Sequence, residues 1–265
     1  MRGGLAAVPQ AWWQALQSEA DQPPAAPREP LRWGSAEIGS IEPVLSRLAA
    51  LESWLERSGD GWEVRGADLS SALAAIAVVL RDAGLVRAWR DELLGVHDAS
   101  GHAVGRIERG AVRLLGISTH AVHLAAWAPD GRFWLQQRAF DKPNDPGLWD
   151  TLVGGMVPAG ESGLAALERE TWEEAGLRFA QLEGLARGGS FLTRRPSAEV
   201  AHGYVVERLD WYRCVLPPGT VPVNQDGEVA RFEGMAAREV ARRLQQDEFT
   251  LEAALILRAA TAGTA

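Results

Sequence analysis

The spacing of apolar and polar residues divides the chain into a first part of mixed elements and a second part rich in strands. In the first part, QAWWQALQ (residues 10–17) and the apolar spacing of residues 43–59 predict two helices. A third helix is expected over residues 68–84, with Asp68 as its N-cap. Residues 92–110 then predict two short strands or a hairpin. These elements indicate a small α+β unit.

From about Thr119 onward, apolar runs and turn signals indicate a larger sheet. Residues 119–140 predict two strands joined by a turn, with Asp130 and Gly131 at its tip. The remaining elements are expected in this order: a strand over 148–155, a helix over 164–177, strands over 202–217 and 227–235, and helices over 237–246 and 248–260. Because strands alternate loosely with helices, we expect an α/β fold in which a mixed sheet carries helices on both faces.

A Pro/Ala-rich stretch, SEADQPPAAPREP (residues 18–30), lacks hydrophobic periodicity and predicts a linker or a surface strap. We therefore expect residues 1–30 to be loosely ordered or linker-like, within an N-terminal α+β domain over residues 1–115. A second domain is expected over residues 116–265. No apolar run approaches the ~18 residues needed to span a bilayer, so no membrane segment is expected.

The charge and cysteine content limit the classes of partner. The chain has 265 residues and a formal net charge of −8 at pH 7. This charge disfavours duplex nucleic acid as a partner, since proteins that bind it usually carry a basic excess on the binding face. An acidic protein that binds an anionic substrate needs a cation between the two. Cys214 is the one cysteine, which excludes an intramolecular disulfide and favours a reducing compartment, most simply the cytoplasm.

A glycine-rich stretch, WDTLVGGMVPAGES from Trp149 to Ser162, precedes the helix expected over residues 164–177. Without side chains at Gly154 and Gly155, the backbone can approach a metal ion or a phosphate closely. Gly160 allows the loop to turn so that Glu161 faces the helix. The positive end of the helix also lies near this loop and favours anions.

The helix after this loop concentrates carboxylates on one face. One stripe is expected to face the core, and it holds Leu164, Leu167, Thr171 and Ala175. Glu170, Glu173 and Glu174 fall within about 100° of one another on another face, where they repel by a few tenths of a kcal/mol per pair. Arg169 is the one basic residue close enough in sequence to relieve them. A solvated acidic face is the simple alternative, but the loop and the missing basic partners favour a site for Mg²⁺, which prefers oxygen ligands.

These residues resemble a known motif. Gly155, five residues, Glu161, seven residues and then RETWEEAGL from Arg169 to Leu177 are similar to the Nudix box, whose pattern is G-x5-E-x7-R-E-U-x-E-E-x-G-U with U a bulky apolar residue. Thr171 departs from the pattern, since a bulky aliphatic residue is usual there, but it removes no ligand. The resemblance implies a Nudix α/β/α sandwich that hydrolyses a diphosphate bond with water and Mg²⁺ or Mn²⁺.

The resemblance also implies roles for individual residues. Glu170, Glu173 and Glu174 would bind the metal with help from the Gly154 carbonyl, and Arg169 would hold the glutamates. Glu161 would lie near the metals and orient or deprotonate the water. The general base stays open among three acids, which are Glu161, Glu174 and Glu228.

Several further residues are candidates for substrate contacts. Arg138 could hold a phosphate or form a surface ion pair. Lys142 and Trp149 flank the glycine loop and are candidates for contacts with a phosphate and an aromatic ring, respectively, although a tryptophan is more often part of the core. Gly155 would let the backbone approach the substrate.

Two other pairs of residues leave their roles open. His120 and His123 are three apart in an expected strand, so they point to opposite faces. One of them could reach the substrate, but the simpler interpretation of each is a structural histidine. Arg194 and Arg195 form a basic cluster that lies either near the site or in a polar loop.

The resemblance extends over about residues 31–258 to a two-domain Nudix group, whose N-terminal domain is also found with thiamine pyrophosphokinase in fungi. It implies that a phosphate is removed from thiamine diphosphate or an oxidised analogue. The alternatives are a nucleotide-type substrate (an oxidised nucleoside triphosphate, ADP-ribose or NADH) and a Nudix-fold binding or regulatory protein without catalysis. An isomerase of allylic diphosphates is disfavoured, because such enzymes use a catalytic cysteine and Cys214 lies well after the box. The N-terminal domain would form part of the pocket or the interface of a homodimer.

Overall fold

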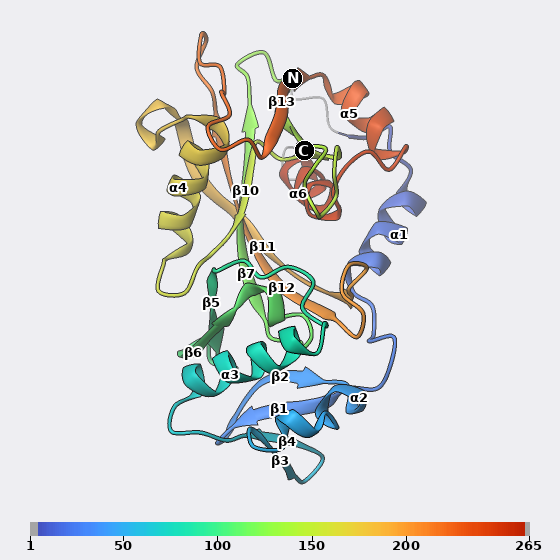
Figure 1. Cartoon of the computed structure of the whole chain (residues 1–265). Coiled ribbons are helices and arrows are strands. Elements are labelled where there is room, and N and C mark those ends of the chain that lie inside the picture. Colours follow the sequence, from blue (N-terminus) through green and yellow to red (C-terminus); the bar gives the residue numbers. More distant parts are fainter. Residues whose placement is uncertain (1–4, 263–265) are drawn as a thin grey trace.

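The computed structural model describes residues 5–262 and consists of two bodies stacked on each other (Figure 1). The smaller body contains a sheet in the order β2-β1-β4-β3, helix α3 and the hairpin β5–β6. Their bounds are β1 Glu29–Trp33, β2 Ala36–Ile41, β3 Leu55–Ser58, β4 Gly61–Val64, α3 Leu69–Asp82, β5 Leu93–His97 and β6 Ala103–Glu108. Asp68 caps α3 by accepting a hydrogen bond from the Ser71 amide, as the sequence predicts.

The larger body is a mixed sheet in the order β11-β12-β7-β8-β13, with β10 paired to β7 and β9 paired to β8. The strands are β7 Thr119–Trp127, β8 Phe133–Arg138, β9 Trp149–Asp150, β10 Val153–Met156, β11 Glu183–Pro196, β12 Tyr204–Val215 and β13 Val229–Met235. β12 runs parallel to β7, whereas β8 and β10 run antiparallel to it. The expected strand over residues 148–155 is divided into β9 and β10.

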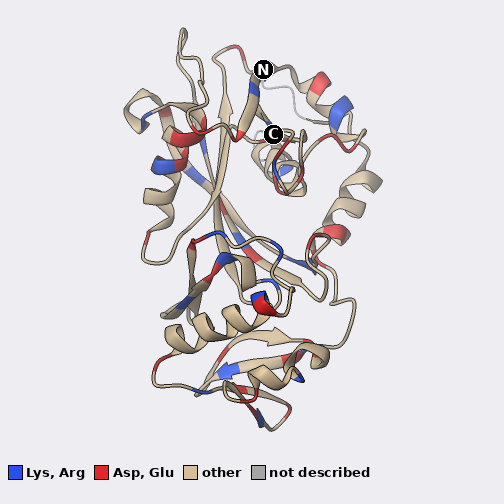
Figure 2. Cartoon of the chain, viewed as in Figure 1, with Lys and Arg blue, Asp and Glu red and all other residues tan. Residues whose placement is uncertain are grey.

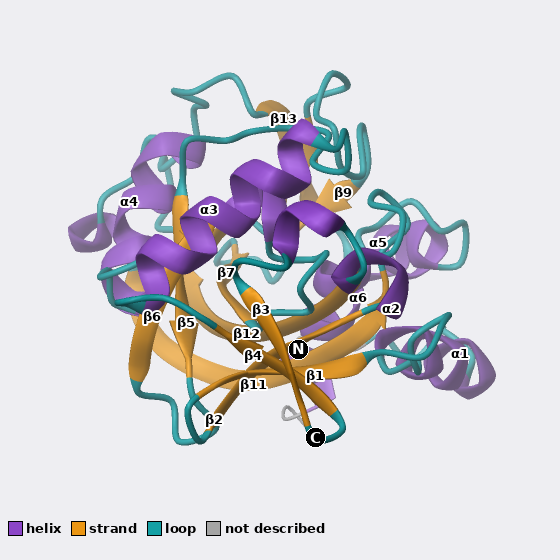
Figure 3. Ribbon diagram, turned by 60° about the horizontal axis from the view of Figure 1, so that its bottom comes forward, coloured by secondary structure: helices purple, strands orange, loops and turns teal. Residues whose placement is uncertain are grey.

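Helices cover both faces of this sheet, so the expected α/β/α sandwich is confirmed (Figure 3). The helices are α4 Gly163–Ala175, α5 Ala237–Leu244 and α6 Leu251–Ala262. Val122 and Leu124 of β7 pack in the same core cluster as α4, whereas Ala125 and Trp127 pack in the cluster of α6. This alternation follows from the opposite directions of successive side chains in a strand. Within residues 5–262, no helix is long and apolar enough to cross a membrane.

The N-terminal segment is more ordered than the composition indicates. Gln10–Ala20 forms helix α1, whose Trp13 and Leu16 are buried in the same cluster as α6. The helix predicted over residues 10–17 is therefore confirmed, whereas the expectation of a loosely ordered segment over residues 1–30 does not hold for α1. Residues 1–4 lie outside the described part. Residues 22–28 contain no helix or strand, which agrees with a strap that connects α1 to β1.

The helix expected over residues 43–59 does not form. This segment contains only the short helix α2 Pro43–Ser46, the 3-10 turn η1 Ala49–Leu51 and strand β3. The apolar spacing is satisfied by a hairpin instead, in which Gly59 adopts a φ of +58° at the turn between β3 and β4. Strands β1, β2 and β11 were not predicted, because their apolar residues do not alternate clearly along the chain.

The two bodies are joined next to the glycine loop. The amide of Ala159 donates to the carbonyl of Leu93 at 2.8 Å, and Leu94 forms a bridge with Pro158. The Tyr204 amide also donates to the Arg113 carbonyl at 2.8 Å. The edge of the β5–β6 hairpin is therefore hydrogen-bonded to the loop between β10 and α4.

The packing of α1 can be tested by removing its largest buried side chain. Trp13→Ala is expected to destabilise the protein by about 3 kcal/mol or more, because it leaves a cavity between α1 and α6. Gln17→Ala, on the exposed side of α1, should change the stability by less than about 0.5 kcal/mol. Urea unfolding followed by circular dichroism measures both, and equal midpoints for the two variants would contradict this packing.

Candidate active site

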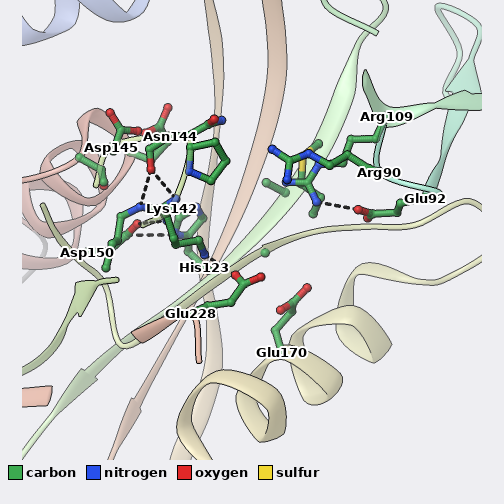
Figure 4. Close-up of a pocket in the computed structure, with 18 of the residues that line it drawn as sticks. Arg90, Glu92, Arg109, His123, Lys142, Asn144, Asp145, Asp150, Glu170 and Glu228 are labelled. Carbon is green, nitrogen blue, oxygen red and sulfur yellow. Dashed lines mark hydrogen bonds and ion pairs between the residues drawn. The ribbon is translucent and has the colours of Figure 1, made fainter. Parts of the chain in front are cut away.

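A cavity of about 670 Å³ lies between the two bodies, and α4 forms one of its walls. Figure 4 shows Glu170 on α4 facing this cavity, with Glu228 and Lys142 beside it. Among the described residues that line it, eleven are Asp or Glu and seven are Lys or Arg. Charged segments of both signs border this region (Figure 2). The cavity is therefore strongly polar and has a surplus of negative charge.

A cap at its first turn and a buried apolar stripe determine how α4 packs on the sheet. The Ser162 hydroxyl caps its first turn by accepting from the Ala165 amide at 3.2 Å. Leu167, Thr171 and Ala175 are buried as expected, and the Thr171 hydroxyl donates to the Leu167 carbonyl at 2.6 Å. This hydrogen bond satisfies the hydroxyl of Thr171, the residue that departs from the motif. Leu164 is 50% exposed, contrary to expectation, because burial on α4 begins only after its first turn.

Three carboxylates share the single guanidinium of Arg169. Its Nη1 donates to Glu170 Oε1 at 2.9 Å and to Glu173 Oε2 at 2.7 Å. Its Nε and Nη2 lie 3.3 Å from Glu161 Oε2. Burial raises the pKa of Glu170 to about 7, and the opposing charge of Arg169 only partly offsets it. One positive charge thus holds three acids together without neutralising them.

Glu174 faces the sheet instead of the cavity. It is 1% exposed, and its Oε2 accepts from the Gly154 amide at 2.9 Å and from Gln136 Nε2 at 3.0 Å. Burial raises its pKa to about 8. The carboxylate therefore anchors the backbone of the glycine loop to α4.

Gly154 and Gly155 of the glycine-rich stretch lie in strand β10 and make close approaches that a side chain would prevent. A Cβ on Gly155 would overlap the carboxyl group of Glu170, and a Cβ on Gly154 would lie 2.7 Å from the His123 ring. Both glycines line the cavity. The loop backbone can therefore lie directly against the acidic face of α4.

A second charged group lies beside Glu170. Lys142 forms an ion pair with Glu228, and both line the cavity. Partial burial raises the pKa of Glu228, but Lys142 outweighs this effect, with smaller contributions from Arg109 and Arg138, and holds the pKa below its usual value. Arg138 donates to the Asn144 carbonyl at 3.0 Å and lies 3.6 Å from Asp150. Glu228 is therefore an ionised carboxylate at the cavity surface.

Besides Glu174, two of the candidate residues do not reach this cavity. Trp149 is 1% exposed in the hydrophobic core, where its ring lies beneath the guanidinium groups of Arg231 and Arg243 at 5.1 Å each. The expected substrate contact of Trp149 is thus corrected to a structural role. Glu161 approaches the far side of Arg169 and lines a separate, smaller cavity.

One member of the histidine pair and one member of the basic cluster line the cavity, and the other two do not. His120 pairs with Asp210 at 2.9 Å, which fits a structural histidine. His123 lines the cavity and contacts the Thr151 hydroxyl at 3.0 Å. Arg194 pairs with Asp21 outside the cavity, whereas Arg195 lines it and pairs with Glu252 at 3.1 Å.

The sequence reasoning missed a set of arginines on the smaller body. Arg90, Arg109 and Arg113 line the same cavity as Glu170. They come from the loop after α3 and from the turn after β6, and Figure 4 shows Arg90 and Arg109 directed into the space opposite Glu170. The sequence contains little that would single out these arginines as site residues, because arginines near the ends of strands are common at protein surfaces.

The donor set was compared with the requirements of a divalent cation. Among residues 5–262, no three His, Cys, Asp or Glu side chains converge as a metal-binding group. Glu170 and Glu173 are directed to Arg169, and Glu174 is directed to Gly154. However, Glu170 and Glu173 supply incompletely neutralised oxygens beside the open backbone of Gly155, and hard cations prefer such donors. The donor chemistry therefore suits a hard divalent cation, but in this arrangement the described side chains do not converge on a single point.

Comparison with known proteins identifies the larger body. The model of the NUDIX domain family matches residues 118–256. Nudix hydrolase 20 of Arabidopsis thaliana is 31% identical over 188 residues, which cover 69% of this chain and 49% of that protein. An isopentenyl-diphosphate Delta-isomerase of Serratia proteamaculans is 38% identical over 86 residues, or 32% of this chain and 48% of that protein. The chain thus spans about half the length of these curated relatives.

A solved structure supports the fold of the larger body. The structure of DR0079 from Deinococcus radiodurans matches with a TM-score of 0.51 and 22% identity, over 63% of this chain and 99% of that one.

Divalent cations should stabilise the protein through the acidic face of α4. At a concentration about 100-fold above the dissociation constant, Mg²⁺ or Mn²⁺ should add about 2.7 kcal/mol and raise Tm by several degrees. Glu173→Gln should remove most of this shift, whereas Glu168→Gln, an exposed acid on the same helix, should retain it. Differential scanning fluorimetry with and without EDTA measures the shift, and an undiminished shift in Glu173→Gln contradicts the assignment.

Proposed function

We propose that this chain, which belongs to the NUDIX domain family, is a metal-dependent hydrolase of a diphosphate bond. Enzymes of this family generally use divalent metal ions. The observation that carries the proposal is the acidic face of α4, which borders a large cavity directly beside the side-chain-free backbone of Gly154 and Gly155. A binding protein without catalysis would have no need to keep this complete set of carboxylates.

In this proposal Glu170 and Glu173 hold the metal, together with the Gly154 carbonyl. Bound Mg²⁺ or Mn²⁺ would neutralise phosphate oxygens and lower the pKa of a bound water molecule. Arg169 keeps the two carboxylates on one side of the helix by hydrogen bonds of 2.9 and 2.7 Å. Glu174 acts indirectly, since its bond to the Gly154 amide fixes the loop.

Glu228 is the favoured general base among the three acids that the sequence leaves open. It lines the cavity, and Lys142 keeps its carboxylate ionised and therefore able to accept a proton from the attacking water. Glu161 lines a different cavity, and the carboxylate of Glu174 is already bonded to Gly154 and Gln136.

A thiamine-type diphosphate is the favoured substrate. The cavity wall has four more carboxylates than Lys and Arg side chains among its described residues. Bound metal ions would neutralise part of this excess negative charge, and a positively charged organic group such as a thiazolium ring would neutralise more of it. The match to Nudix hydrolase 20 extends over 188 residues, more than the 139 residues of the NUDIX match, which supports a two-domain relationship. Nucleotide-type substrates are the second candidate.

Isomerisation is disfavoured despite the similarity to an isopentenyl-diphosphate Delta-isomerase. Cys214 of β12 is buried in the hydrophobic cluster between the sheet and α4, and burial raises the pKa of its thiol to about 12. It does not line the large cavity. A thiol in this position cannot take part in proton transfer to a substrate beside α4.

Two substitutions separate metal binding from proton transfer. Glu173→Gln should lower kcat/KM at least 100-fold, equivalent to about 2.7 kcal/mol, and should abolish metal-induced stabilisation. Glu228→Gln should lower kcat while the metal-induced Tm shift remains. Glu233→Gln on β13 is the matched control and should keep full activity. Steady-state kinetics measure the rates, and full activity in Glu173→Gln would end the proposal.

The substrate preference can be measured with a panel. We expect kcat/KM for thiamine diphosphate or an oxidised analogue to exceed that for nucleoside triphosphates, ADP-ribose and NADH by about tenfold or more, or about 1.4 kcal/mol. Thiamine diphosphate releases inorganic phosphate directly, whereas ADP-ribose and NADH need a coupled phosphatase for the same detection. Faster turnover of a nucleotide would reject thiamine compounds and leave metal-dependent hydrolysis intact.

A further inference from the structure

The arginines of the smaller body have spare hydrogen-bonding capacity. The Arg90 side chain is exposed to the cavity, and within residues 5–262 its guanidinium forms no hydrogen bond or ion pair. Arg109 uses Nη1 for Glu92 at 2.6 Å, and its Nε and Nη2 form no hydrogen bond with the described part of the chain. A guanidinium carries five N–H donors, so most of these donors remain available to a ligand.

The backbone that carries these arginines is held by a buried carboxylate. Glu108 is 3% exposed, and its Oε1 accepts from the Arg90 amide at 2.7 Å and from the Gly110 amide at 3.2 Å. The Arg109 amide donates to the Glu92 carbonyl at 2.8 Å. The loop after α3 and the turn after β6 are therefore locked to each other, which fixes the spacing between the two arginines.

These groups lie outside the matched family domain. The NUDIX match begins at residue 118, whereas Arg90 and Arg109 belong to the smaller body. Figure 4 shows both side chains directed into the cavity from the side opposite Glu170. The cavity thus has an acidic wall on α4 and a guanidinium wall on the smaller body. Guanidinium groups form paired hydrogen bonds with phosphate oxygens, and metal-loaded carboxylates bind such oxygens from the other side.

We propose that Arg90 and Arg109 bind the phosphate group of the substrate that lies farther from α4, so that the smaller body forms one wall of the active site. This inference rests on the proposed diphosphate substrate. The inference assigns the smaller body a role in substrate binding. The hydrolase domain alone would then lack part of its active site. The competing role for these arginines is to balance the acidic wall and stabilise the fold, which would affect unfolding but not phosphate affinity.

Inorganic pyrophosphate is the probe that separates these roles. Isothermal titration in EDTA at low ionic strength, with the full chain, isolates the arginine wall from the metal site. Arg90→Ala and Arg109→Ala should each weaken pyrophosphate binding about tenfold, because each removes a charge-assisted contact. Arg47→Ala is the control, since Arg47 is an exposed arginine of the same body that does not line the cavity, and it should bind normally.

Kinetics provide a second measurement. Arg90→Ala should raise KM about tenfold for the best substrate of the panel, and Arg90→Lys should restore only part of the loss, because lysine lacks the planar fork. Unchanged pyrophosphate affinity in the Arg90→Ala/Arg109→Ala double variant, or an equal loss in Arg47→Ala, would overturn the inference while leaving hydrolysis untouched. Loss of affinity in the double variant, with no metal-dependent hydrolysis by the wild type, would instead uphold the binding wall and reject the proposed function.

Discussion

The shared guanidinium of Arg169 is the interaction on which the candidate site depends. Three carboxylates converge on it, two from its own helix and one from the loop before it. Without this group, the acidic side chains of α4 would repel one another and point into solvent. With Arg169 in place, the carboxylates stay close together at the edge of a cavity, and their negative charge is only partly neutralised. This condition favours the binding of a divalent cation. The site is therefore held in a state of unsatisfied negative charge.

The parts of the site that could be predicted are those that lie close together in sequence. The glycine loop, Arg169 and the glutamates of α4 follow one another within one loop and one helix, so helical spacing alone brings them together. Even there, the prediction for Glu174 was incomplete. It lies only about 20° from Leu167 around a helix with 100° per residue, so it points toward the core and the sheet buries it. A helical wheel shows which residues share a face of the helix. It does not show how far the sheet covers that face.

The parts that could not be predicted depend on tertiary contacts. Arg90 and Arg109 approach α4 only because the smaller body is joined to the loop after β10, and no local pattern encodes that contact. Trp149 was misjudged for a similar reason, since proximity to the loop in sequence does not determine which side of the strand its ring occupies. The helix expected over residues 43–59 failed because apolar residues at helical spacing can also be buried by a turn followed by a short hairpin.

The hydrogen bond between Ala159 and Leu93 has a mechanical consequence. A two-stranded hairpin is marginally stable by itself in water, and β5–β6 gains a third backbone partner from the loop between β10 and α4. The loop gains rigidity from the same pairing. The segment that carries Gly160 and Glu161 is thus braced by a part of the chain outside the family domain, and its local unfolding is coupled to that of the hairpin. A destabilising change in β5 should therefore loosen the loop between β10 and α4, even though the altered residue touches none of the acids.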